Sequence, residues 1–146
     1  MLTVISDCLT ALLQLLKQAH LTAKDYQDHL LYERLQDGID EDIDRVKEIA
    51  LACGYSDEIA NARQSLHNAT NVLDRTNSIT DLEQETITEI NKIIKKLNRE
   101  DSDEENTSID GIFNESVAKE AIINMLGDIA EKRTRDLYLL RFGGNQ

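Results

Sequence analysis

Four long stretches of this sequence carry apolar residues at the three- and four-residue spacing of an α-helix, and proline is absent from all 146 residues. Because proline stops or kinks a helix, its absence lets each stretch form one uninterrupted helix. The chain is rich in strong helix formers, and aromatic residues make up only 4% of it. Its length suits one domain, so we expect residues 1–146 to form a single all-α domain.

The helical periodicity predicts four long helices at about 2–20, 23–53, 78–99 and 110–141. A shorter helix is expected after Ser56, in the connection between the second and third long helices. Thr22 and Asp25 predict a capping box ahead of the second helix, and Gly54 predicts its end. The acidic run 100–110 lacks apolar periodicity and is expected to be a loop. This pattern favours an antiparallel four-helix bundle.

The predicted helix 23–53 carries a polar stripe. At about 100° per residue, five polar side chains would fall within an arc of roughly 100°: His29, Glu33, Asp40, Asp44 and Glu48. An apolar stripe would lie about 150° away and face the core: Leu31, Leu35, Ile39, Ile43, Val46, Ala50 and Cys53. Imidazole and carboxylate are groups that iron and similar divalent ions bind, so the outward stripe is a candidate metal site.

Three large apolar side chains, Tyr26, Leu30 and Leu51, lie in or beside the polar arc. A face that only meets water gains nothing from such groups, so we expect a second subunit to cover them. The segment 2–20 carries two apolar rows and is expected to be buried on two sides. Both features predict a homo-oligomer built from twofold dimers.

The spacing of the acids also favours a twofold dimer. On one straight helix Glu33 and Asp44 would be about 16 Å apart at 1.5 Å per residue, too far to share an ion. Two copies crossing antiparallel near Gly38 would bring His29 and Glu33 of one subunit to Asp44 and Glu48 of the other, twice per dimer. Close backbone approach at that axis would be a reason to keep Gly38 inside a helix.

The segment HLTAKDYQDHLLYERLQDGIDEDIDRVKE resembles the Dps family, the mini-ferritins. The second histidine, the acid four residues later and the Asp-x-x-x-Glu pair eleven residues after that acid keep the family's relative spacing. The end of the chain, NMLGDIAEKRTRDLYLLRF, is loosely similar to the family's last helix. The resemblance implies a ferritin-like antiparallel four-helix bundle with a short extra helix between its second and third helices. It also implies a hollow homo-oligomer, a dodecamer in this family.

The resemblance implies a site shared between two subunits. His20, His29 and Glu33 would be metal ligands from one subunit, and Asp44 and Glu48 from its twofold mate. All of these except His20 are also expected to be catalytic, as a ferroxidase that oxidises Fe(II) with peroxide or oxygen. The ferric iron would be stored in the shell, which protects against oxidative damage.

Several positions depart from the family pattern. Only eight residues, LTAKDYQD, separate His20 from His29, whereas the family usually has about three more and a Gly-Pro turn. The family more often has Asp at the position of Glu33, and Leu21 stands where it commonly has tryptophan. The short connection between His20 and His29 favours an alternative. In that alternative the chain is a non-catalytic ferritin-like assembly or adaptor protein that has lost its metal chemistry. Stoichiometric Fe(II) binding would distinguish the two.

Composition and motifs argue against several other functional classes of protein. The net charge of −12 and the lack of a basic tail make DNA binding unexpected, because binding a polyanion requires lysine and arginine. No histidine belongs to a Glu-x-x-His motif, so a di-iron centre inside the bundle is not expected; His67 is taken as a surface or packing residue. The first twenty residues lack the pattern of a signal peptide and are too polar to span a membrane, which predicts a cytoplasmic protein.

Overall fold

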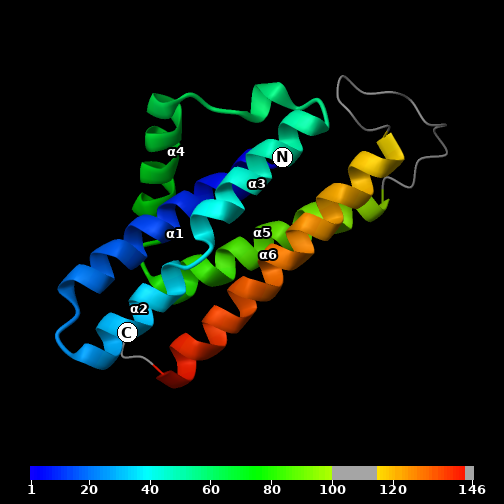
Figure 1. Cartoon of the computed structure of the whole chain (residues 1–146). Helices are drawn as coiled ribbons and strands as arrows, with labels where there is room; N and C mark the ends of the chain where they lie inside the picture. The colour runs from blue at the N-terminus through cyan, green and yellow to red at the C-terminus, as the bar shows by residue number, and fades with distance from the viewer. Residues whose placement is uncertain (100–114, 144–146) are drawn as a thin grey trace.

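The computed structural model describes residues 1–99 and 115–143, and every regular element in these ranges is helical (Figure 1). The elements are, in order, α1 (Thr3–Thr22), α2 (Tyr26–Gln36), α3 (Ile39–Ala52), the 3-10 helix η1 (Ser56–Glu58), α4 (Ala62–Arg75), α5 (Ile79–Arg99) and α6 (Glu115–Gly143). The all-α prediction is confirmed for these residues. The predicted loop 100–110 and the predicted helical residues 110–114 lie outside them. Among the described helices, none is both long and apolar enough to cross a membrane.

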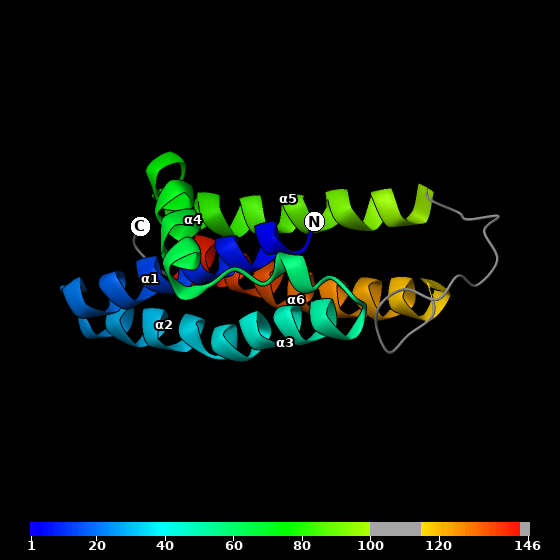
Figure 2. The ribbon, with the colours of Figure 1, turned by 90° about the horizontal axis from the view of Figure 1, so that it is seen from above.

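The long helices form a bundle. Helix α1 packs against α3 and α5, and α6 packs against the same two helices, so these four form a closed ring of neighbours. In Figure 2, α1 and α6 run in one direction, and α2, α3 and α5 run in the other. The connection between α3 and α5 includes α4, which packs against α1 at a steep angle to the bundle (Figure 1). Neighbouring α1 and α3 are therefore antiparallel, as are α5 and α6.

Helix α1 is the centre of the core. It contacts α2, α3, α4 and α5, and apolar side chains from both of its predicted rows are fully buried, among them Ile5, Cys8, Leu9, Leu12 and Leu16. The expected burial on two sides is confirmed. Burial of this kind supplies about 25 cal/mol for each Å² of apolar surface removed from water, so α1 contributes substantially to the stability of the bundle.

The predicted helix 23–53 is wrong in one respect, because two helices occupy this segment. Asp37 leaves the helical conformation with φ −58° and ψ 128°, and Gly38 follows with φ 83° and ψ −7°. That left-handed conformation costs glycine little but is strained for residues with a Cβ. Gly38 is thus the N-cap of α3 rather than a residue inside a helix, and the angles and the 16 Å distance expected for one straight helix do not apply across it.

The core stripe survives this break. Leu35 of α2 is buried, as are Ile39, Ile43, Val46 and Ala50 of α3. The two helices are anchored unequally, however, since Tyr32 and Leu35 are the only buried residues among the 11 of α2. Helix α2 packs chiefly against α1, whereas α3 packs against both α1 and α6.

The turn before α2 also differs from the prediction. The carboxylate of Asp25 caps α2 by accepting a hydrogen bond from the backbone N–H of Asp28 at 2.8 Å. Thr22 remains in the last turn of α1, where its hydroxyl donates to the carbonyl oxygen of Gln18 at 2.8 Å. A threonine bonded in this way cannot cap the next helix, so Asp25 acts alone.

The second connection agrees only in part with the sequence pattern. Gly54 ends α3 with φ 86°, as predicted. The short helix begins at Ala62 rather than at Ser56, because the Asn61 side chain caps it by accepting from the N–H of Gln64 at 2.9 Å. Only a 3-10 turn follows Ser56. Leu66 of this helix is 68% exposed.

A buried ionic cluster joins α5 to α6. Arg133 of α6 is only 1% exposed, and its Nη1 donates to Oε1 of Glu83 on α5 at 3.2 Å. Its Nη2 forms an ion pair with Asp136 at 2.9 Å. Burial raises the pKa of Glu83 to about 8, although Arg133 acts in the opposite direction, and burial also raises the pKa of Asp136. One cation therefore faces two carboxyls in a region that water scarcely reaches.

Candidate metal centre

Two histidines meet where α1 and α2 join. His20 lies in the last turn of α1, and His29 lies in the first turn of α2. Because the two helices are antiparallel and joined by a short turn, the two imidazole rings are brought together, with centroids 3.9 Å apart and planes inclined by 31°. The eight-residue connection that departs from the family pattern therefore does not keep the histidines apart.

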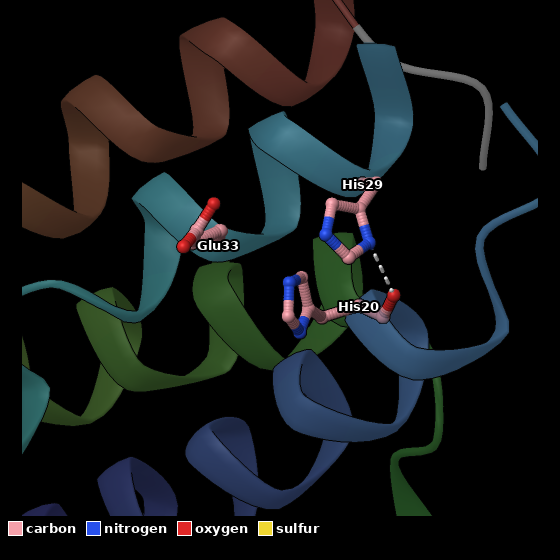
Figure 3. A group of neighbouring side chains, drawn as sticks. All are labelled: His20, His29 and Glu33. Carbon is pink, nitrogen blue, oxygen red and sulfur yellow. Dashed lines mark hydrogen bonds between the residues drawn. The ribbon is translucent and has the colours of Figure 1, made fainter. Parts of the chain in front are cut away.

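Glu33 completes a three-residue group. It lies one helical turn after His29, so both side chains project from the same face of α2. One ligand atom from each of the two imidazoles and one carboxylate oxygen lie within 4.8 Å of one another. Three ligands that bind one ion tetrahedrally at about 2.1 Å lie about 3.4 Å from one another, so the most distant of these atoms would need to approach by up to about 1.4 Å. Figure 3 shows the two imidazole rings beside each other, with Glu33 farther along α2.

One hydrogen bond places a proton on Nδ1 of His29. Its Nδ1 lies 3.1 Å from the main-chain carbonyl oxygen of His20 (Figure 3). A carbonyl oxygen can only accept, so Nδ1 must carry the proton. In the neutral ring Nε2 then keeps its lone pair, which is the form that binds a metal ion. The backbone of α1 thus both orients the ring and selects its tautomer.

His20 contributes an unsatisfied buried atom. Its Nε2 is buried and makes no hydrogen bond among the described residues. A buried polar atom without a partner normally costs about 1–3 kcal/mol. Such atoms are rare enough in folded proteins to need an explanation, and a bound ion is one of the recognised explanations.

The surroundings of the group are apolar but open. The Tyr26 ring stacks near His29, with centroids 6.3 Å apart, and is 73% exposed. Leu30 is exposed too, and so is Leu51, which lies farther along the chain near the end of α3, so all three residues point away from the core. Glu33 is exposed while both histidines are half-buried. An ion held here would be bound on one side by protein and would have coordination positions open to solvent or to another molecule.

Asp44 and Glu48 do not join this group within one chain. Both lie on α3, beyond the break at Gly38, and both are exposed, as the outward polar stripe predicts. The group that the described residues form contains His20, His29 and Glu33. The structure therefore brings together three of the five predicted ligands, and the contribution of Asp44 and Glu48 from a second subunit stays a prediction.

His67 has no part in the group, since it is exposed on α4 with its Nε2 3.3 Å from Nδ2 of Asn71. Sequence reasoning missed the bond from His29 to the main-chain oxygen of His20, which depends on how the helices pack. A sequence signal did exist for the cap that positions α2, since Asp25 precedes Asp28 by three residues.

The chain matches no protein-family model, no curated protein and no solved structure.

Proposed function

We propose that this chain binds Fe(II), or a divalent ion of similar chemistry, at His20, His29 and Glu33. The observation that carries the proposal is the buried, unpartnered Nε2 of His20, which lies in a group whose other two members already offer ligand atoms. Two neutral imidazoles and one carboxylate with open positions form a ligand set typical of non-haem iron. Zinc accepts the same set, so the ion itself must be established by experiment.

The three ligand residues have different roles in binding the ion. His20 and His29 supply neutral nitrogen, and Glu33 supplies an anionic oxygen that stabilises the ferric ion more than the ferrous ion. The Nδ1 bond of His29 to the α1 backbone keeps its ring in the binding orientation before any ion arrives. The exposed Glu33 can move over the small distance needed to close the site.

We further propose that the site is completed in a twofold dimer, as in the Dps-like mini-ferritins that the sequence resembles. Asp44 and Glu48 of the twofold mate would add two carboxylates, and both side chains are exposed and make no ion pair among the described residues. Exposed Tyr26 and Leu30 beside the site offer apolar area for such a contact. Fe(II) oxidised there by peroxide or dioxygen would be stored in a closed homo-oligomeric shell, a dodecamer.

The helix arrangement supports this proposal. The two outer long helices of the chain, α1 and α6, run parallel, and α3 and α5 run opposite to them. A connection that includes α4 spans from α3 to α5. This is the up-down-down-up order of a bundle with one long crossover, which ferritin-like folds use.

A titration of the full chain tests the metal-binding step. We expect anaerobic Fe(II), and Co(II) as a spectroscopic probe, to bind at one ion per chain, and His29→Ala and Glu33→Gln to weaken binding at least about tenfold. His67→Ala is the matched control, since it removes an exposed histidine far along the sequence and should leave binding unchanged. Absence of stoichiometric binding would favour the adaptor function, and equal loss in His67→Ala would show that binding is nonspecific.

A further inference from the structure

A cavity with a cationic lining lies at the α2–α3 break itself. A cavity of about 320 Å³ opens between this break and α6, which is at the lower end of the size range of small-molecule sites. Four cationic side chains line it, together with two carboxylates: Arg34, Lys132, Arg133 and Arg135, with Asp37 and Asp136. In a chain with a net charge of −12, this lining reverses the prevailing charge.

Two of these cations are already neutralised by neighbours. Lys132 pairs with the buried Asp42 at 3.0 Å, and Arg133 pairs with Glu83 and Asp136. Arg133 nevertheless keeps one unused donor, since its Nε is buried and makes no hydrogen bond within the described ranges. These ion pairs thus connect the α6 wall of the cavity to α3 and α5.

The other two cations are unpaired. Neither Arg34 of α2 nor Arg135 of α6 forms an ion pair with any described residue, although Asp37 and Asp136 line the same cavity. Both arginines are exposed and reach the cavity from different helices. A guanidinium group is a rigid fork of donors that matches two oxygens of an anion.

We propose that this cavity binds a small phosphate-class oxyanion, free or as the phosphoryl group of a small molecule. A single carboxylate offers two oxygens and therefore one edge for bidentate binding, which one guanidinium fork already uses. A phosphoryl group offers at least three around one centre, so forks from Arg34 and Arg135 can bind different edges of it. Asp37 and Asp136 repel any anion in the cavity, and Asp136 already interacts electrostatically with both arginines. A doubly charged anion gains more from the two cations than a singly charged anion does.

The test uses the full chain dialysed against EDTA, so that no metal ion can bridge the anion to protein. Inorganic phosphate and pyrophosphate are titrated by calorimetry, with sodium chloride and sodium acetate at the same ionic strength as references. We expect phosphate and pyrophosphate to bind and to raise the melting temperature, whereas chloride and acetate do neither. Binding of pyrophosphate without inorganic phosphate would assign the site to diphosphates and would still support the proposal.

Matched charge variants locate the site. Arg34→Gln and Arg135→Gln should each weaken binding about tenfold. Arg141→Gln removes the same charge from an exposed arginine of α6 that does not line the cavity, and it should change binding less than about twofold. All three side chains are exposed, so folding should be preserved, which circular dichroism checks. Equal weakening in Arg141→Gln, or binding no stronger than that of chloride, would overturn the proposal.

Discussion

The Nδ1 atom of His29 lies 3.1 Å from the main-chain carbonyl oxygen of His20, while the Nε2 atom of His20 itself has no hydrogen-bond partner among the described residues. One histidine thus orients the other through its backbone and offers its own side chain separately. The two contributions of His20 can be separated by mutation.

His20→Ala removes the imidazole but keeps the carbonyl oxygen. We expect His29 to retain its Nδ1–H tautomer, while Co(II) affinity falls by more than the roughly 10–100-fold that loss of an outer-shell partner costs. Long-range ¹⁵N–¹H NMR of the imidazole nitrogens reports the tautomer, and optical titration reports the affinity. If His29 changes tautomer in this variant, the backbone oxygen does not orient it.

Gly38→Ala tests the helix break. A Cβ at Gly38 would meet Glu41 Oε2 and Lys132 Nζ at 3.9 Å, which is ordinary contact, so the cost arises from the φ of 83°. We expect a loss of about 1–2 kcal/mol in the free energy of unfolding, measured by urea denaturation. Gly127→Ala is the control, since Gly127 lies inside α6 and a methyl group there would meet nothing within 4 Å. The Gly127→Ala variant should have a free energy of unfolding about 0.5–1 kcal/mol higher than that of the natural chain. If Gly38→Ala and Gly127→Ala both raised or both lowered the free energy of unfolding, the left-handed conformation assigned to Gly38 would be contradicted.

The Glu83, Arg133 and Asp136 cluster predicts a pH-dependent stability. Burial raises the pKa of Glu83 from 4.5 to about 8, so between these values the folded chain holds a proton that the unfolded chain releases. The free energy of unfolding should therefore fall as the pH rises from about 5 to about 8. Urea denaturation at pH 5, 6.5 and 8 measures the slope.

Glu83→Gln should flatten that slope, because the amide resembles the protonated carboxyl and cannot release a proton. Glu89→Gln changes a partly exposed acid on the same helix and should keep the slope of the natural chain. Identical slopes for the natural chain and Glu83→Gln would show that Glu83 stays ionised beside Arg133.

Mixed dimers test the shared site. His29→Ala and Glu48→Ala chains should each be inactive in Fe(II) oxidation as homodimers, because every site lacks a ligand. In a mixed dimer the twofold places both lesions in one site and leaves the other complete, so about half of the sites should recover. The measurement is the Fe(II) oxidation rate after native mass spectrometry has shown that mixed dimers form. No recovery would mean that Glu48 serves the same site as His29 of its own chain, and an active Glu48→Ala homodimer would mean that Glu48 serves no site.

The buried faces of the helices could be predicted from the sequence, whereas their breaks and contacts could not. Ile39, Ile43 and Val46 repeat with the helical period because burial on one face imposes it. Gly38 interrupts the helix without disturbing that pattern. The sequence suggests close approach at a twofold axis as the reason for a glycine at this position, whereas the structure shows that the reason is its left-handed backbone conformation.

The candidate site shows the same division. The i, i+4 spacing of His29 and Glu33 follows from local helix geometry, so sequence reasoning could pair them. The approach of His20 depends on how α1 packs against α2. The ion pair of Arg133 with Glu83 joins residues 50 positions apart in a buried region. Charged residues are seldom found in such a region, so the sequence pattern did not predict this pair.

The light anchoring of α2 has a dynamic consequence. A helix that buries only Tyr32 and Leu35 and rests chiefly on α1 should open locally more often than α3 or α5, because little apolar contact is lost when it separates. The ligand atoms of His29 and Glu33 move with it, whereas His20 stays on the central helix. An ion bound by all three side chains would hold α2 against α1. The amide protons of α2 would then exchange more slowly with solvent, whereas exchange rates in the rest of the bundle would scarcely change.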